Sequence, residues 1–325
     1  MNAENMTIFT DFILVGFTTD PKINAAIFVL FFIIYVVTFT GNGLIIILVI
    51  INAQLHKPMY LFLCVLSVLD LCYSTAVLPR LLADLFSTER IISYFSCGLQ
   101  MYVILLVEGS ECQLLTVMAY DRYVAICQPL HYPVLMRWGN CYKLLALVFI
   151  LTFMLCTLPS IANPITICSN HVNHFMCEML AVLKLSCEGI ASSELQIFSV
   201  SFITLLLPLV LILLSYSAII SSVLKLRSVG RSKAFSTCTS HLLVVALYFG
   251  TAMLMYFGPS SMYSTDQEKY SSIFYVIVSP MLNPLIYTLN NQEAKEAIKK
   301  VLAKKPLNKR ILALTYLSHL NISNP

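Results

Sequence analysis

Long apolar segments separated by short polar connections dominate this chain. Each segment reaches or nearly reaches the ~20 residues that an α-helix needs to cross the hydrocarbon core of a bilayer. Runs of this length, without the alternation of a β-barrel strand, favour helices. The pattern therefore predicts an all-α membrane protein, a bundle of seven transmembrane helices. The seven runs are Ala25–Ile51, Met59–Leu82, Phe95–Cys127, Tyr142–Ile161, Leu195–Leu224, Ala234–Phe257 and Ser271–Leu289.

A shorter pattern of another kind follows the seventh run. Ala294, Ala297, Ile298, Val301 and Leu302 recur at helical spacing, and Glu and Lys residues fill the other positions. This spacing predicts an amphipathic helix lying on the inner leaflet. The expected organisation is an extracellular tail over residues 1–24, a seven-helix domain over residues 25–290, and a cytoplasmic amphipathic helix with a tail over residues 291–325.

Composition and charge support membrane insertion and predict its direction. Only 11% of the 325 residues are charged and 58% are hydrophobic, whereas a soluble domain averages about 25% charged residues. Of the 20 Lys and Arg residues, fifteen fall on the side opposite the N-terminus, which by the positive-inside rule is cytoplasmic. The N-terminus is then outside, where Asn5 begins an N-glycosylation acceptor, Asn-Met-Thr. The other five are Lys22, Arg80, Arg90, Lys184 and Lys269.

Three carboxylates lie deep in the predicted helices, where charge is costly and is usually paired or functional. Asp70 is twelve residues beyond Pro58, roughly 18 Å along a helix, and Glu111 should lie at a similar depth. Together they can hold a cation, or remain a neutral hydrogen-bonded pair in which one is protonated. Glu108 shares a helix face with Glu111, and it can face a ligand or pack against another helix.

Four of the eleven cysteines fall on the predicted outer side, which favours two disulfides. They are Cys97, Cys168, Cys177 and Cys187, and four cysteines allow three pairings. The same long loop carries His171 and His174, which either bind a metal or are solvated. We expect the solvated state, because the cysteines have no metal-ligand spacing and the histidines are scattered.

Ordered motifs along the chain resemble the rhodopsin-like G-protein-coupled receptors, and within them the odorant receptors. The resemblance covers nearly the whole chain. The motifs are Leu55-His-Lys-Pro-Met-Tyr60, Leu66-Ser-x-x-Asp70, Met118-Ala-Tyr-Asp-Arg-Tyr-Val-Ala-Ile-Cys127, Pro129-Leu-His-Tyr132, Ser215-Tyr216, Lys233-Ala-Phe-Ser-Thr-Cys238 with Ser240-His-Leu242, and Pro280-Met-Leu-Asn-Pro-Leu-Ile-Tyr287.

The resemblance implies a function, a location and partners. It implies a multi-pass receptor of the plasma membrane, not an enzyme, that binds a small, mostly apolar volatile ligand and activates a stimulatory G protein to raise cAMP. Membrane lipid is the surrounding partner, and nucleic acid is not expected. It also implies the disulfides Cys97–Cys177 and Cys168–Cys187, and a sodium-like cation near Asp70, Glu111 and Asn283.

Specific residues take roles by the same resemblance. Arg122 would rest against Asp121 when inactive and meet the G protein when helix six swings outward, and His241 would join the inactive contact with helix three. Tyr216 and Tyr287 would stabilise the opened state. Tyr123, Asn283 and Pro284 belong to the same activation motifs, and Pro284 predicts a kink. Receptors of this family bind their ligand in the outer half of the bundle, between helices three, five, six and seven. By spacing from the matched motifs, the residues implied to line that site are Leu105, Glu108, Gly109, Ser201, Thr204, Phe249, Ala252, Met253, Tyr256, Ile273 and Val276.

Two departures and two alternatives accompany this interpretation. The family usually has Phe-Tyr-Gly in mid helix six, whereas Tyr248-Phe249-Gly250 reverses the aromatic order and removes a hydroxyl from the switch position. The Arg that commonly follows Tyr287 is absent. The first alternative is a receptor of the same fold for a non-odorant small molecule, although Ile104 stands where amine receptors carry a carboxylate. The second is an ion-coupled transporter using Asp70 and Glu111, against which the absence of an internal repeat argues.

Overall fold

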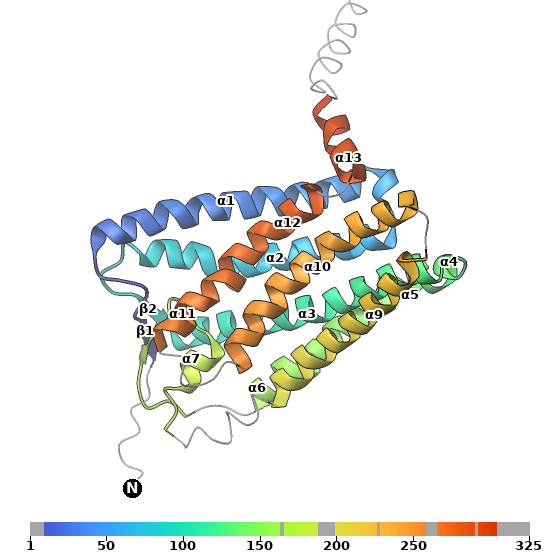
Figure 1. Ribbon diagram of the computed structural model, residues 1–325. Helices are drawn as coiled ribbons and strands as arrows, with labels where there is room; N and C mark the ends of the chain where they lie inside the picture. Colours follow the sequence, from blue (N-terminus) through green and yellow to red (C-terminus); the bar gives the residue numbers. More distant parts are fainter. Residues whose placement is uncertain are drawn as a thin grey trace, which may run out of the picture.

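The computed structural model describes residues 10–162, 166–187, 199–225, 228–257, 265–289 and 292–303. Long helices pack side by side into one bundle (Figure 1). Six helical segments are long and apolar enough to cross a membrane, and a shorter apolar stretch, Cys238–Leu254, lies within the remaining long helix. The prediction of a seven-helix bundle is therefore confirmed for the part of the chain described.

Three of the seven bundle helices contain a π-helical turn. The helices of the bundle are α1 Pro21–Ile51, α2 Pro58–Asp84, α3 Tyr94–Cys127, α5 Trp138–Thr152 with α6 Leu158–Ala162, α9 Leu207–Val223, α10 Ser228–Phe257, and α11 Thr265–Ile273 with α12 Ser279–Leu289. The π-helical turns are Phe153–Thr157 between α5 and α6, Phe202–Leu206 before α9, and Phe274–Val278 between α11 and α12.

The helix boundaries follow local chemistry. Asp20 accepts a hydrogen bond from the Lys22 amide and Pro21 opens α1, as expected at a helix N-terminus. Ser93 caps α3 in the same way, by accepting from the Ser96 amide. Pro58 opens α2, as its position after the first connection predicts.

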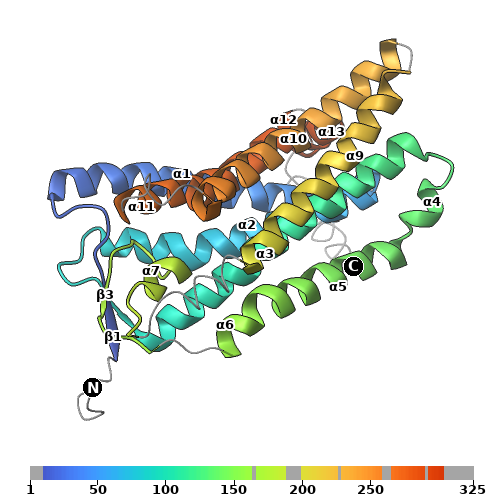
Figure 2. The same cartoon turned by 60° about the horizontal axis from the view of Figure 1, so that its bottom comes forward.

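A small sheet and two disulfides close one end of the bundle, which we call the strand end. Its three strands are β1 Asp11–Leu14, β2 Ile91–Ser93 and β3 His171–Val172, in the order β2-β1-β3, with β1 antiparallel to β2 and parallel to β3. The short helix α7, Met179–Leu183, lies beside them (Figure 2). Both predicted disulfides, Cys97–Cys177 and Cys168–Cys187, are present. They fasten the loop of residues 166–187 to the start of α3 and to itself.

The opposite end, which we call the α4 end, carries α4, Tyr132–Leu135, and α13, Gln292–Ala303 (Figure 1). α13 confirms the predicted amphipathic helix, and Ala294 and Ala297 are buried among those of its side chains that the structure describes. Glu293 accepts two hydrogen bonds from Lys57, both 2.8 Å, and a third from Tyr60, 3.0 Å. The start of α13 is thereby held to the connection between α1 and α2.

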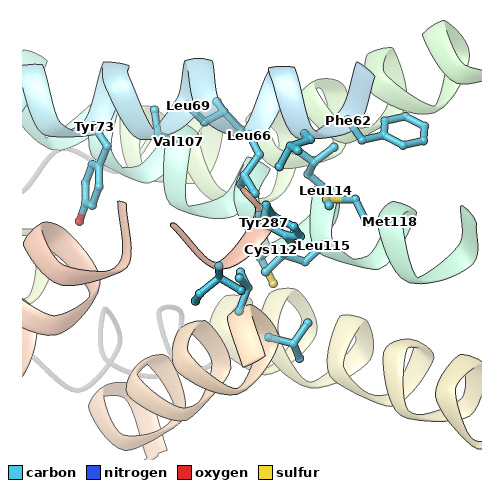
Figure 3. Packing of buried hydrophobic residues seen from close by; sticks show 14 of the residues in the cluster. Phe62, Leu66, Leu69, Tyr73, Val107, Cys112, Leu114, Leu115, Met118 and Tyr287 are labelled. Carbon is cyan, nitrogen blue, oxygen red and sulfur yellow. The ribbon is translucent and has the colours of Figure 1, made fainter. Parts of the chain in front are cut away.

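The core of the bundle lies where α2, α3 and α12 meet. Buried side chains from these helices interdigitate around Leu66, Leu114, Leu115 and Tyr287 (Figure 3). Large apolar side chains elsewhere, such as Phe32 and Ile47 of α1, are about half exposed. In a membrane protein these exposed apolar faces meet lipid.

Candidate functional site

A cavity of about 100 Å³ lies in the half of the bundle nearer the strand end. It is lined by residues of α3, the α5–α6 segment, α7, the π-turn before α9, α10 and the π-turn after α11. Six of the residues predicted to contact a ligand lie around this one cavity. They are Leu105, Glu108, Gly109, Ser201, Thr204 and Ala252.

Four other predicted residues do not line this cavity. Phe249 and Val276 are buried in the main core, 2% and 0% exposed. Ile273 is partly buried against the same core, and Met253 is partly buried. The side chain of Tyr256 lies outside the described residues.

Ten lining residues were not predicted from the motifs. Five come from the α5–α6 segment and α7, namely Cys156, Pro159, Ser160, Met179 and Leu180. The motif spacing concerned helices three, five, six and seven, so it gave no signal for these. The other five are Cys112, Val200, Leu205, Tyr248 and Tyr275.

Glu108 supplies the carboxyl group on the cavity wall, and it also contacts a neighbouring helix. Tyr73 of α2 donates a 2.6 Å hydrogen bond to its Oε1 atom. Tyr248 of α10 donates a 2.5 Å hydrogen bond to its backbone carbonyl. The reversed order of Tyr248 and Phe249 therefore places the hydroxyl at the cavity one residue before the expected position.

Gly109 allows α3 to approach α5 closely. A Cβ atom at this position would lie 2.6 Å from Cγ2 of Thr152 and 3.1 Å from Sγ of Cys156. These distances are shorter than van der Waals contact, so a larger residue would displace the wall of the cavity.

Asp70 and Glu111 are buried deep in the bundle, as expected. Nδ2 of Asn283 donates to both carboxylate oxygens of Asp70, at 3.0 and 3.1 Å. Oε1 of Glu111 and Oγ of Ser110 are buried and have no hydrogen-bond partner among the described residues. Hard cations such as sodium prefer oxygen ligands, so this donor set is chemically suited to one.

Arg122 and Asp121 form an ion pair at the α4 end, with 3.7 Å between Nε and Oδ2. Tyr132 of α4 donates a 2.9 Å hydrogen bond to Oδ1 of Asp121. Burial and the nearby carboxylate raise the pKa of Tyr132, which keeps its hydroxyl protonated as the donor. Tyr123 accepts a hydrogen bond from Gln128 of the same segment, 3.2 Å.

His241 links three helices near this ion pair. Its Nε2 atom lies 3.1 Å from the Leu115 carbonyl of α3 and its Nδ1 atom 2.8 Å from the Tyr216 hydroxyl of α9. A carbonyl only accepts, so Nε2 carries the proton and Nδ1 accepts from Tyr216. Oη of Tyr287, close by in sequence to Pro284, is buried without a hydrogen-bond partner in the part of the chain described.

The loop histidines differ from each other. His171 is exposed, but His174 is 1% exposed, so the expectation that both are solvated is wrong for His174. Its Nδ1 accepts from the Met176 amide, and its Nε2 contacts Oγ of Ser272 at 3.2 Å. The loop closes over α11 and buries the ring. The described residues contain no group of three or more His, Cys, Asp or Glu side chains placed to hold a metal.

Comparison with known proteins agrees with this geometry. The chain matches the family model described as "Olfactory receptor" over residues 31–305. Olfactory receptor 5AR1 of Mus musculus is 45% identical over 309 residues, 94% of this chain and 100% of the relative. Olfactory receptor 2B2 of Homo sapiens is 42% identical over 100% of this chain and 95% of the relative.

A solved structure shows the same fold at lower identity. The crystal structure of squid rhodopsin superposes with a TM-score of 0.70 at 17% identity, covering 88% of this chain and 87% of that chain. The family consists of receptors, so the expectation of a non-enzymatic protein is confirmed. With the family model and the near-full-length relatives in agreement, the chain belongs to the olfactory receptor family.

Proposed function

We propose that the chain is an odorant receptor that binds small, mostly apolar volatile molecules in the cavity beside Glu108 and activates a stimulatory G protein. The N-terminus would be extracellular, the protein would reside in the plasma membrane, and activation would raise cAMP. The observation that carries the proposal is the cavity between helices of an olfactory receptor fold, lined mainly by apolar groups.

The size of the cavity supports a small ligand. Pockets for drug-sized molecules are typically ~300–1,000 Å³, whereas this cavity is about 100 Å³. Burial of apolar surface contributes only ~25 cal/mol per Å² and binding also has an entropic cost, so affinity should be modest. A ligand activates only if it binds the active state better than the inactive one.

One helix provides a physical link between the cavity and the α4 end. Tyr248 lines the cavity, and His241, seven residues earlier on α10, contacts the Leu115 carbonyl of α3. Residues seven apart lie on the same face of a helix. A ligand that shifts α10 at the cavity would thus loosen the His241 contact and free Arg122 to meet a G protein.

A cation beside Asp70 belongs to the same proposal. Asp70, Glu111 and the amide oxygen of Asn283 would hold sodium between α2, α3 and α12. The support is the two buried carboxylates, together with a buried Oε1 atom of Glu111 that has no partner within the described residues. Such an ion would stabilise the packed, inactive arrangement.

A cell assay tests the proposal directly. Cells expressing the receptor with an N-terminal tag are exposed to a panel of neutral volatiles and, separately, of amines, and cAMP is measured with and without the stimulatory Gα subunit. We expect a cAMP rise for some volatiles, only when the subunit is present, with the tag labelled on intact cells. If the receptor is labelled on the cell surface and no volatile raises cAMP, the odorant assignment is overturned. A ligand-evoked current independent of G protein would favour a channel or transporter instead.

A further inference from the structure

Most hydroxyl groups on the cavity wall already donate a hydrogen bond to a backbone carbonyl of the protein. Oγ1 of Thr204 donates to the Val200 carbonyl at 2.8 Å, and Oγ of Ser160 donates to the Cys156 carbonyl at 2.9 Å. Tyr248 donates to the Glu108 carbonyl at 2.5 Å. A hydroxyl has one proton and two lone pairs, so these three groups present lone pairs to a ligand.

The remaining polar atoms strengthen this bias toward acceptors. The thiol of Cys112 donates to the Thr204 carbonyl at 2.9 Å. Oε2 of Glu108 has no hydrogen-bond partner within the described part of the chain, while Oε1 accepts from Tyr73 at 2.6 Å. In its carboxylate form, Glu108 therefore presents Oε2 to a ligand as an oxygen that only accepts.

Ser201, just before the π-turn that leads into α9, differs from these three hydroxyls. Its hydroxyl lines the cavity and forms no hydrogen bond with another described residue, so it can donate or accept. It carries no charge, however, and hydrogen bonds to charged groups are about twice as strong as neutral ones. The strongest polar contact available to a ligand is thus a donated hydrogen bond to Glu108.

We infer that the cavity selects small organic molecules that donate a hydrogen bond, namely alcohols and primary amines, over molecules of the same size that only accept, such as ketones and aldehydes. The inference rests on the proposed function, because it takes this cavity as the odorant site. A ketone beside Glu108 brings the lone pairs of its carbonyl oxygen against those of the carboxylate. No hydrogen bond forms between them, and the desolvated carboxylate is left without a donor. An alcohol in the same place donates to Oε2 and keeps its apolar body against Leu105, Leu180 and Leu205.

Matched pairs of volatiles test the inference. Concentration–response curves for cAMP are measured with cyclohexanol against cyclohexanone, benzyl alcohol against benzaldehyde, and cyclohexylamine as the amine. Four receptors are compared: the wild type, Glu108→Gln, Glu108→Asp, and Glu89→Gln as a control at an exposed loop carboxylate. Labelling of an N-terminal tag on intact cells normalises each response.

We expect the alcohol or amine to act at a concentration at least about tenfold lower than its acceptor-only partner in the wild type. The ratio should persist in Glu89→Gln and shrink severalfold in Glu108→Gln, because a carboxamide also donates and can bind a ketone. Glu108→Asp, which keeps an acceptor-only group, should retain the preference even if Glu108→Gln fails to reach the surface.

Each other outcome has a defined meaning. If ketones and aldehydes act as well as their alcohols in the wild type, or if Glu108→Gln leaves the ratio unchanged at the surface, the inference is wrong while the odorant assignment stands. If no volatile in the panel of either class raises cAMP at a labelled receptor, the proposed function fails, and this inference fails with it.

Discussion

The side-chain amide of Asn42 donates a hydrogen bond to the backbone carbonyl of Pro280, joining α1 to α12 across 3.0 Å. Pro284 lies four residues later and has no N–H group, so α12 cannot satisfy that carbonyl itself. Gly41 leaves room for the contact, because a Cβ atom there would lie 3.0 Å from Cγ of Pro284. A polar side chain of one helix thus completes the backbone hydrogen bonding of another.

Removing this amide should destabilise the receptor. In Asn42→Ala the buried Pro280 carbonyl loses its partner, and we expect a loss of roughly 1–3 kcal/mol in the free energy of unfolding. Thermal unfolding of the purified receptor in detergent measures this. Thr40→Ala is the matched control, since Thr40 is exposed on the same helix and its hydroxyl bonds only to α1. Equal melting temperatures for both variants would show that the Asn42 contact contributes nothing.

The ion pair of Asp121 and Arg122 leads to a signalling prediction. Arg122→Ala should abolish ligand-evoked cAMP while leaving the receptor on the cell surface, because the guanidinium is the group proposed to meet the G protein. Arg137→Ala, at the start of α5, controls for loss of a positive charge on the same end. Persistent signalling from Arg122→Ala would mean that this residue does not have the proposed role.

Substitutions of His241 and of Tyr216 should have different effects on basal and on ligand-evoked activity. His241→Leu removes the hydrogen bond to the Leu115 carbonyl that holds α10 against α3, so ligand-independent cAMP should rise severalfold. Tyr216→Phe keeps that contact and should instead lower the maximal evoked response without raising the basal level. Ligand-independent cAMP and the maximal evoked response are both measured at equal surface density of the receptor. A lower basal level in His241→Leu would contradict the assignment of this contact to the inactive state.

His174 should make stability depend on pH. Burial and the charge of Lys269 lower the pKa of His174 to about 3, so the folded protein keeps the ring neutral. Above pH ~6.5 the unfolded chain is also neutral and the full stability is present. As the pH falls below ~6.5, only the unfolded state takes up the proton, and stability drops toward the folded-state pKa.

The expected loss between pH ~7.5 and ~5.5 is roughly 1 kcal/mol. Thermal unfolding at these two pH values measures it in the wild type, in His174→Gln and in His171→Gln. The first variant should lose the His174 share of the pH dependence, whereas the second, at an exposed histidine three residues earlier, should keep it. An identical pH dependence in all three proteins would rule out this origin.

The apolar pattern predicted the bundle well because lipid imposes one rule on every spanning segment. α10 nevertheless begins at Ser228, six residues before the apolar run that starts at Ala234. The polar stretch before that run continues the helix beyond the hydrocarbon, and hydropathy carries no information about such an extension. The hydrogen bond from Asn42 to the Pro280 carbonyl was not identifiable from the sequence, because it depends on how α1 packs against α12.

The candidate cavity was only partly predictable. Spacing from the matched motifs placed Glu108 and Thr204 at the cavity, since regular helices fix which residues share a face. It gave no information on Met179, which a disulfide-held loop brings to the cavity, or on Cys156, which lies in a π-helical turn. Tertiary packing and a changed helical repeat both lie outside what spacing can predict.

The bonds of Glu293 to Lys57 and Tyr60 have a mechanical consequence. They fasten α13 to the corner between α1 and α2, and Asn283 joins α12 to α2 through Asp70. With the bond of Asn42 to the Pro280 carbonyl, polar contacts join α1, α2, α12 and α13 to one another. α10 is joined to α3 by the hydrogen bonds that His241 and Tyr248 form with backbone carbonyls of α3. We therefore expect α10 to be the helix that moves on activation, and its Tyr248 lines the proposed odorant cavity.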